Sequence, residues 1–118
     1  MFEYSITIRT LGTAGKKYQN TLDCISRQTI SPKQVFVILP EGYSLPKERL
    51  GNELFVYSNK GMVSQRISGF QVCQTEYLLA LDDDVDFDNN FVEELFETIV
   101  KTNADFALPI VNECKRGG

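Results

Sequence analysis

Apolar residues along the chain fall into short runs and helical rows that alternate with each other. Short runs with many apolar residues predict strands at Tyr4 to Thr10, Val35 to Leu39, Leu54 to Tyr57, Tyr77 to Leu81 and Phe106 to Val111. Apolar residues three or four positions apart predict helices between them. These helices are Lys17 to Gln28, a segment marked by Val63, Ile67 and Phe70, and one with two rows, Phe91, Leu95, Ile99 and Val92, Phe96, Val100. The two adjacent rows form a wide stripe that indicates packing on a core.

The predicted order is strand, helix, strand, strand, helix, strand, helix, strand. Alternation of this kind predicts an α/β fold, with a mostly parallel sheet of about five strands covered on both faces by helices. Ligands of such sheets bind beyond the carboxyl ends of the strands, near the point where the strand order reverses. The loops in that position begin at Arg9, Pro40, Ser58 and Asp82.

Three adjacent aspartates, Asp82, Asp83 and Asp84, directly follow the fourth predicted strand. Carboxylates so close together repel one another, and each needs solvent or a cation. A divalent cation would relieve this repulsion. If the strand geometry continues, Asp82 and Asp84 point to the same side and share one ligand system, while Asp83 faces elsewhere. The alternative is a solvated acidic turn, with Asp88 or Asn89 capping the next helix.

Composition narrows the classes of protein. The 118 residues suit one compact domain, and 42% hydrophobic with 24% charged residues is typical of globular proteins. The chain has no histidine, which excludes Ser-His-Asp and Cys-His catalysis and His-ligated metals. Any metal site must therefore use oxygen ligands, which favours Mg²⁺ or Mn²⁺. The net charge of −4 argues against general nucleic-acid binding.

The cysteines and the absence of long apolar segments indicate the cellular compartment of the protein. Cys24, Cys73 and Cys114 are odd in number and far apart, which predicts reduced thiols rather than a disulfide scaffold or a zinc ribbon. No apolar stretch approaches the roughly 20 residues of a membrane span, and the first residues do not resemble a signal peptide. We therefore expect a cytoplasmic protein, including a place at the inner face of a membrane.

Several short motifs follow one another in order along almost the whole chain. They are Ser5-Ile6-Thr7-Ile8, Arg27-Gln28-Thr29, Val35-Phe36-Val37-Ile38-Leu39, Asn59-Lys60-Gly61 with Arg66 and Gly69, Glu76-Tyr77-Leu78-Leu79-Ala80-Leu81-Asp82-Asp83-Asp84, and Ala104-Asp105. Each motif alone is common. The ordered set resembles the N-terminal, nucleotide-sugar-binding half of an inverting, family 2-type glycosyltransferase with the Rossmann-like GT-A fold.

The resemblance implies a nucleotide-diphosphate sugar donor, commonly UDP-linked, a Mn²⁺ or Mg²⁺ ion, and transfer to an acceptor hydroxyl with inversion. Asp84 would bind the metal, and Asp82 would lie near the ribose or the metal. Arg66 would pair with phosphate, its alternative being a surface helix arginine. The nucleotide-binding set would be Arg9, Thr10, Leu11, Glu41, Gly61, Arg66, Asp82 and Asp83. Arg9, Thr10 and Leu11 would flank the base. The alternative is that they form an ordinary loop at the end of the strand.

The chain also departs from the family pattern. Arg9 stands where the family usually has Pro. The family also usually has an Asn near the position of Gly12. After the second strand, the stretch from Pro40 to Tyr43 replaces Asp-Asp-Gly-Ser. Glu41 would then accept a hydrogen bond from the uracil ring. These changes leave the identity of the base open and indicate a divergent subgroup.

Family members carry the acceptor site and the catalytic base in a following segment. We therefore expect residues 1–118 to be a single donor-binding domain from a longer glycosyltransferase, with the catalytic base outside it. Glu113, the only acid after the fifth predicted strand, is not expected to be that base. The acceptor would be a glycan, a lipid or a protein. The exposed edge of such a half-sheet predicts self-association.

Two other functions fit the pattern less closely. One is a degenerate glycosyltransferase-like module that binds a nucleotide without turnover. The other is a phosphatase or response-regulator-like α/β domain. Those domains place their acids after the first strand, and here that strand ends in Arg9 and Thr10.

Overall fold

A computed structural model describes residues 3–59 and 61–102 of the chain. Seven elements follow one another: β1 (Tyr4–Arg9), α1 (Lys16–Ser26), β2 (Gln34–Pro40), β3 (Leu54–Ser58), α2 (Met62–Val72), β4 (Tyr77–Asp82) and α3 (Phe91–Thr102). The order of strands and helices predicted from the sequence is confirmed over these residues. The fifth predicted strand, residues 106–111, lies outside the described part, so the described sheet has four strands rather than the expected five.

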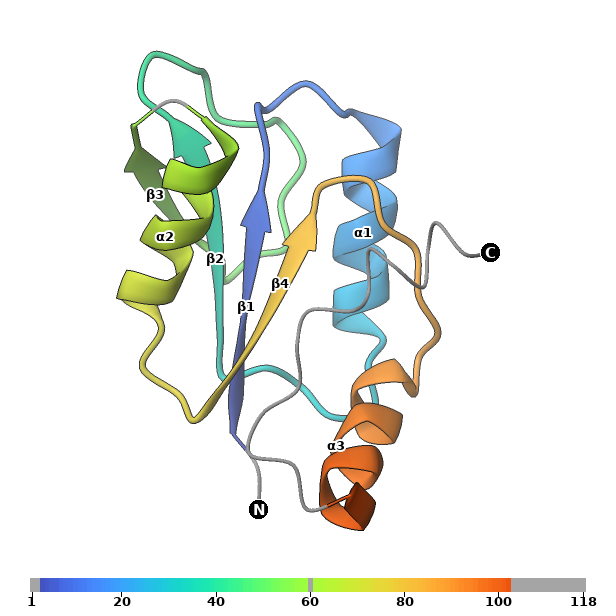
Figure 1. The fold of residues 1–118 in the computed structure, drawn as a ribbon. Coiled ribbons are helices and arrows are strands. Elements are labelled where there is room, and N and C mark those ends of the chain that lie inside the picture. The colour runs from blue at the N-terminus through green and yellow to red at the C-terminus, as the bar shows by residue number, and fades with distance from the viewer. Residues whose placement is uncertain (1–2, 60, 103–118) are drawn as a thin grey trace.

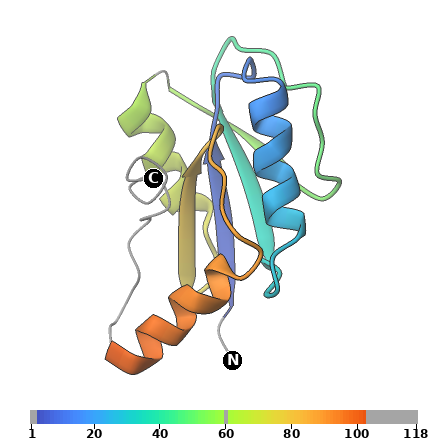
Figure 2. The same ribbon diagram turned by 90° about the vertical axis from the view of Figure 1, so that its right-hand side faces the viewer.

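All four strands are parallel, in the spatial order β3-β2-β1-β4. The two crossovers β1-α1-β2 and β3-α2-β4 lie on opposite faces, so α1 and α3 cover one face and α2 covers the other (Figures 1 and 2). The strand order reverses beside β1, because β2 pairs with one of its edges and β4 with the other. The α/β class with a parallel sheet covered on both faces is confirmed.

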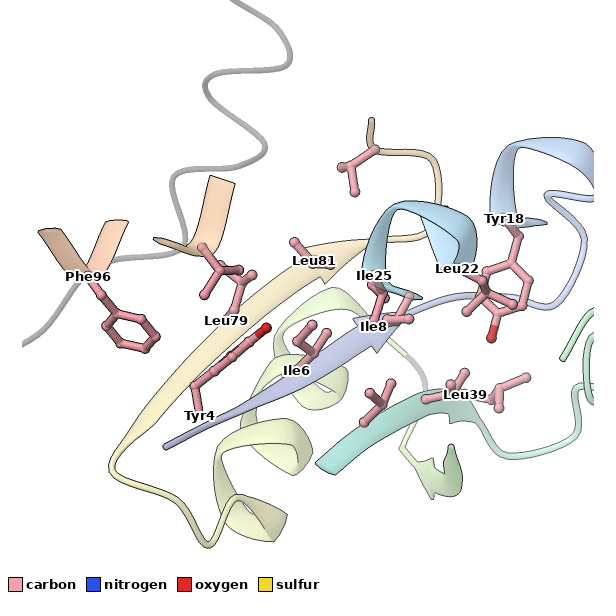
Figure 3. Packing of buried hydrophobic residues seen from close by; sticks show 14 of the residues in the cluster. Tyr4, Ile6, Ile8, Tyr18, Leu22, Ile25, Leu39, Leu79, Leu81 and Phe96 are labelled. Atoms are coloured by element: carbon pink, nitrogen blue, oxygen red, sulfur yellow. The ribbon is translucent and has the colours of Figure 1, made fainter. Parts of the chain in front are cut away.

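The larger core lies between the sheet and the helices α1 and α3 (Figure 3). Alternate residues of the strands point into this core because side chains of a strand alternate between faces. Its members from the strands and the two helices include Ile6, Ile8, Leu22, Ile25, Leu39, Leu79, Leu81, Val92 and Phe96. The other faces of β1 and β2 lie under α2, and there Ser5, Thr7 and Ile38 are also buried. Burial on both faces explains why β2 reads as a nearly continuous apolar run.

Two residues of the predicted helical rows are exposed to solvent. Val100 in α3 is 64% exposed and Ile67 in α2 is 50% exposed. In α3 the buried row consists of Val92, Phe96 and Ile99, which follow the spacing of a single helix face. The expectation that Val100 faces the core is therefore wrong, because the buried stripe is narrower than the apolar stripe in the sequence.

The cysteines, the helices and the edge of the sheet can be compared with the predictions from the sequence. Cys24 and Cys73 are free cysteines, and Cys114 lies outside the described residues. Within the described ranges, no helix has the length and apolar character to cross a membrane. Strand β3 forms one edge of the sheet and exposes Leu54 and Tyr57. Self-association through an exposed edge stays a prediction.

Two buried tyrosines give a matched test of the core. Burial raises the pKa of both Tyr4 and Tyr18, so both phenols stay neutral. The Tyr4 hydroxyl donates to the carbonyl of Ile30, whereas the Tyr18 hydroxyl has no hydrogen-bond partner among the described residues. We expect Tyr4→Phe to lower the free energy of unfolding by about 1 kcal/mol and Tyr18→Phe to leave it unchanged or higher. Urea denaturation measures both, and equal losses would contradict this reading.

Candidate functional site

A cleft of about 720 Å³ opens at the carboxyl ends of the strands. These strand ends lie at the top of the sheet in Figure 1. The cleft lies where the strand order reverses, the place that parallel sheets use for ligands. The wall is built by the loops after β1, β2 and β4, together with the first turns of α1 and α2. Its lining residues are Arg9, Thr10, Leu11, Thr13, Ala14, Lys17, Pro40, Tyr43, Gly61, Gln65, Asp83 and Asp84.

Thr10 fixes the orientation of Asp83 across the ends of β1 and β4. The buried Thr10 hydroxyl donates to Asp83 Oδ2 at 2.6 Å and accepts from the Gly12 N–H at 2.9 Å. Burial raises the pKa of the Asp83 carboxyl, and the charge of Asp84 also raises it, while the bond from Thr10 lowers it. Thr10 therefore offsets part of the cost of placing a carboxylate in this wall.

Asp82 pairs with Arg9 instead of pointing into the cleft beside Asp84. Arg9 and Asp82 lie opposite each other in the β1–β4 register, and Arg9 Nη2 donates to Asp82 Oδ1 at 2.5 Å. Strand β4 ends at Asp82, and a turn follows, so the side chains no longer alternate as in a strand. The prediction that Asp82 and Asp84 share one side is wrong for this reason, since Asp83 and Asp84 line the cleft together.

Asp84 is the exposed carboxylate of the cluster. Its carboxylate makes no hydrogen bond or ion pair with the residues that the structure describes. In the same part of the chain, no three acidic or cysteine side chains come together as a closed metal site. Mg²⁺-type ions commonly bind through one or two carboxylates and complete their shell with substrate phosphates and water. An exposed Asp84 beside Asp83 fits a site of that open kind.

The other predicted residues divide into three groups. Leu11 and Gly61 line the cleft with Arg9 and Thr10, and nucleotide binding by these residues stays a prediction. Glu41 is exposed and is not among the lining residues, and its N–H donates to the Ser58 carbonyl at 2.8 Å. Arg66 belongs to α2, but its side chain lies outside the described part of the structure.

Sequence reasoning missed Gln65, which lies under the cleft. This α2 side chain is only 4% exposed, and its amide nitrogen donates to the carbonyls of Thr10 at 3.1 Å and Ile38 at 2.9 Å. Gln65 therefore ties the ends of β1 and β2 to the helix on the far face. A polar residue two positions before the apolar Ile67 gave no signal, because a glutamine on a helix is normally solvated.

Gln28 holds the loop that follows the acidic cluster. Its buried side chain donates to the carbonyls of Cys24 at 3.2 Å and Asp88 at 2.6 Å, and its Oε1 accepts from the Val92 N–H at 3.1 Å. Gln28 thus caps α3 from a distance, in place of the Asp88 or Asn89 side chain that the acidic-turn alternative assumed. The Thr29 hydroxyl adds a 2.7 Å bond to Glu93.

Two lysines at the start of α1 lie beside Asp84 and Asp86. Lys17 lines the main cleft, and Lys16 and Lys17 line a neighbouring hollow of about 490 Å³ with Asn20, Asp84 and Asp86. Neither lysine forms an ion pair with a described residue. The cleft therefore combines exposed positive charge with the Asp84 carboxylate, a pairing that suits a phosphate ligand and its counter-ion.

Comparison with known protein families assigns the second half of the chain. Residues 51–118 match the model of the family described as glycosyl transferase family 2. The match contains Gly61, the β4 strand and all three aspartates of the cluster. No curated protein matches the chain.

Proposed function

The chain belongs to glycosyl transferase family 2, and from this premise we propose that its cleft binds a nucleotide-diphosphate sugar donor. The observation that carries the proposal is the meeting of Asp83, Asp84 and Lys17 at the reversal point of a parallel sheet. The reaction would transfer the sugar, with inversion, from a nucleotide donor such as a UDP-sugar to an acceptor hydroxyl. Residues 1–118 would supply the donor-binding part.

The chemistry of the residues supports a metal-assisted donor site. Bound Mn²⁺ or Mg²⁺ would neutralise charge on the leaving diphosphate, and Asp84 would hold the ion. Lys17 would place an ammonium group beside the same phosphates. Thr10 would keep Asp83 turned toward the cleft through the 2.6 Å bond. Asp82, held by Arg9 at 2.5 Å, would fix the end of β4 rather than bind the ion.

Family membership supports an enzyme that transfers a sugar. The alternative is a module that binds the nucleotide without turning over the donor. Both predict binding of the nucleotide, but only the enzyme releases or transfers the sugar. Sugar release from a UDP-sugar by this chain in the presence of Mn²⁺ would exclude the non-catalytic module. The acceptor class and the cytoplasmic location stay predictions.

Calorimetric titration with UDP tests donor binding directly. We expect UDP to bind at least about tenfold more tightly with Mn²⁺ than with a chelator, because the ion bridges carboxylate and phosphate oxygens. Uridine lacks the phosphates and should gain nothing from Mn²⁺, so it is the matched control ligand. Equal affinities for UDP with and without Mn²⁺ would overturn the metal-assisted site. Absence of binding by UDP, GDP and dTDP under both conditions would overturn the donor site itself.

A further inference from the structure

Arg9 and Asp82 form an ion pair across the ends of two neighbouring strands. They are the last residues of β1 and β4, and they lie opposite each other in the register of these strands (Figure 1). Two nitrogens of the guanidinium group donate to one carboxylate oxygen, Nη2 at 2.5 Å and Nε at 3.2 Å. The two side chains are only 23% and 16% exposed. Because both groups are largely shielded from water, this pair is held more firmly than an ion pair on the open surface.

The loop that follows Arg9 is fixed by close contacts. Thr10, the next residue, donates to Asp83 and accepts from the Gly12 N–H. Gly12 has a φ of +83°, which glycine adopts without strain. A β-carbon at this position would lie 2.5 Å from the Ser44 carbonyl oxygen, so the loops after β1 and β2 touch here. The loop therefore holds the backbone of Arg9 in place, and the bonds to the neighbouring carboxylate orient its guanidinium group.

The ion pair changes how many carboxylates the cleft offers to a cation. The described residues that line the cleft include Arg9 but not Asp82, although the Asp82 carboxylate lies only one hydrogen bond away from the lining. The acids in this lining are Asp83 and Asp84. Arg9 compensates the charge of Asp82, and Lys17 places another positive charge in the same wall. Among the lining residues that the structure describes, a divalent cation alone therefore meets two carboxylates and two positive charges.

Two carboxylates in such a wall hold a divalent cation weakly by themselves. Mg²⁺ keeps several waters and is usually held by one or two carboxylates together with substrate phosphates. Positive charges near the site lower the affinity for a free cation, but they favour an anionic diphosphate that brings a cation with it. The charges of the wall therefore match a complex of the cation with a diphosphate better than they match the cation alone.

We propose that Arg9 is a positioning residue that keeps Asp82 out of the divalent-cation site, so that the chain takes up the cation together with the diphosphate rather than before it. The proposal rests on donor binding in the cleft, as proposed above. Without the guanidinium group, the Asp82 carboxylate would join Asp83 and Asp84 as a third oxygen ligand. The open site would then become one that holds the cation without a nucleotide.

Mn²⁺ binding to the 118-residue chain without nucleotide tests this role, with the free ion measured by electron paramagnetic resonance. Arg9→Met keeps the apolar stem and removes the charge, whereas Arg9→Lys keeps the charge. We expect Arg9→Met to bind Mn²⁺ roughly 10- to 150-fold more tightly than the wild type, because one charged ligand is added. Arg9→Lys should bind Mn²⁺ as the wild type does. A purely structural role for Arg9 predicts no such gain, because a protein that loses structure binds the ion less tightly.

Matched variants separate binding by Asp82 from a general loss of positive charge. Lys17→Met removes one positive charge from the same wall and leaves the Arg9–Asp82 pair intact, so its gain in Mn²⁺ affinity should be smaller. In the Arg9→Met protein, adding Asp82→Asn should abolish the gain. Adding Asp88→Asn, which changes the net charge equally at an exposed position, should preserve it.

The single variant Asp82→Asn keeps the test decisive if Arg9→Met does not fold. Its amide oxygen still accepts a bond from Arg9, and Asp82 is not a ligand of the ion in the proposed site. The variant should therefore retain the Mn²⁺-dependent gain in UDP affinity. A loss of about tenfold or more would show that Asp82 binds the ion in the wild type, and would overturn the role of Arg9.

The possible results separate this proposal from the proposed function. A folded Arg9→Met protein with wild-type Mn²⁺ affinity would overturn the role of Arg9. An equal gain in Lys17→Met would show a general effect of charge, and would also overturn it. In both cases donor binding stands. Wild-type protein that binds none of UDP, GDP and dTDP would overturn donor binding and, with it, the joint uptake of cation and diphosphate.

Discussion

Asp84→Asn should remove the Mn²⁺-dependent part of UDP affinity while leaving the metal-free affinity unchanged. Asp84 is exposed at the cleft wall and engages no described residue, so the substitution breaks no internal contact. An amide oxygen is a weaker ligand for a hard cation than a carboxylate oxygen is. Loss of one charge-assisted contact of about 1.5–3 kcal/mol corresponds to a drop on the order of 10- to 150-fold. Calorimetry with and without Mn²⁺ measures it.

Asp88→Asn is the matched control for this change. Asp88 is also exposed, lies four positions later, and its substitution alters the net charge by the same amount. We expect its UDP affinity to show the wild-type response to Mn²⁺. If Asp84→Asn keeps the full metal response, the ion is held by other groups, and the role proposed for Asp84 is wrong. Similar losses in both variants would indicate a general charge effect.

Gln28→Leu should lower the free energy of unfolding by about 3 kcal/mol, because it leaves buried backbone groups without their partners. The leucine fills a similar volume but bonds neither the Val92 N–H nor the carbonyls of Cys24 and Asp88, which now contact the amide. For a domain of this size, such a loss lowers the melting temperature by about 10 °C. Thermal unfolding followed by circular dichroism measures the change.

Gln71→Leu on the exposed surface of α2 provides the comparison for the same substitution without buried partners. It should stay within about 0.5 kcal/mol of wild type. If the Gln28→Leu and Gln71→Leu proteins have the same melting temperature, the cap formed by Gln28 contributes little to the stability of the fold. In that case other contacts hold the loop after the acidic cluster, among them the buried Val85 side chain and the 2.8 Å bond from the Thr21 hydroxyl to the Val85 carbonyl.

The sequence predicted the fold well in part because β2 is buried on both faces. Segments such as Val35 to Leu39 are apolar throughout, and few other structures in a chain of this size produce such runs. Element order followed from turn residues between them. The width of the stripe on α3 was overestimated at Val100, since an apolar residue at the rim of a helix face can remain in solvent.

The acidic cluster was predicted at the correct place in the fold but with the wrong geometry. Sequence reasoning extended strand alternation past Asp82, and no local signal marks the turn that follows. The pairing of Arg9 with Asp82 depends on the register of β1 against β4, which the sequence does not contain. The position of Tyr43 in the cleft likewise depends on the close approach at Gly12, a contact between distant loops.

The bonds from Thr10 to Asp83 and from Arg9 to Asp82 each join residues 73 positions apart. At about 5–20 residues per second, a ribosome needs roughly 4 to 15 seconds to add that much chain. During this interval β2 becomes available to β1 early, while the opposite edge of β1 waits for β4. A nascent chain would therefore expose one unpaired edge of the central strand β1 until β4 emerges. If the cleft binds a nucleotide as proposed, a nascent chain would bind it only after that pairing, so bound ligand would report a completed sheet.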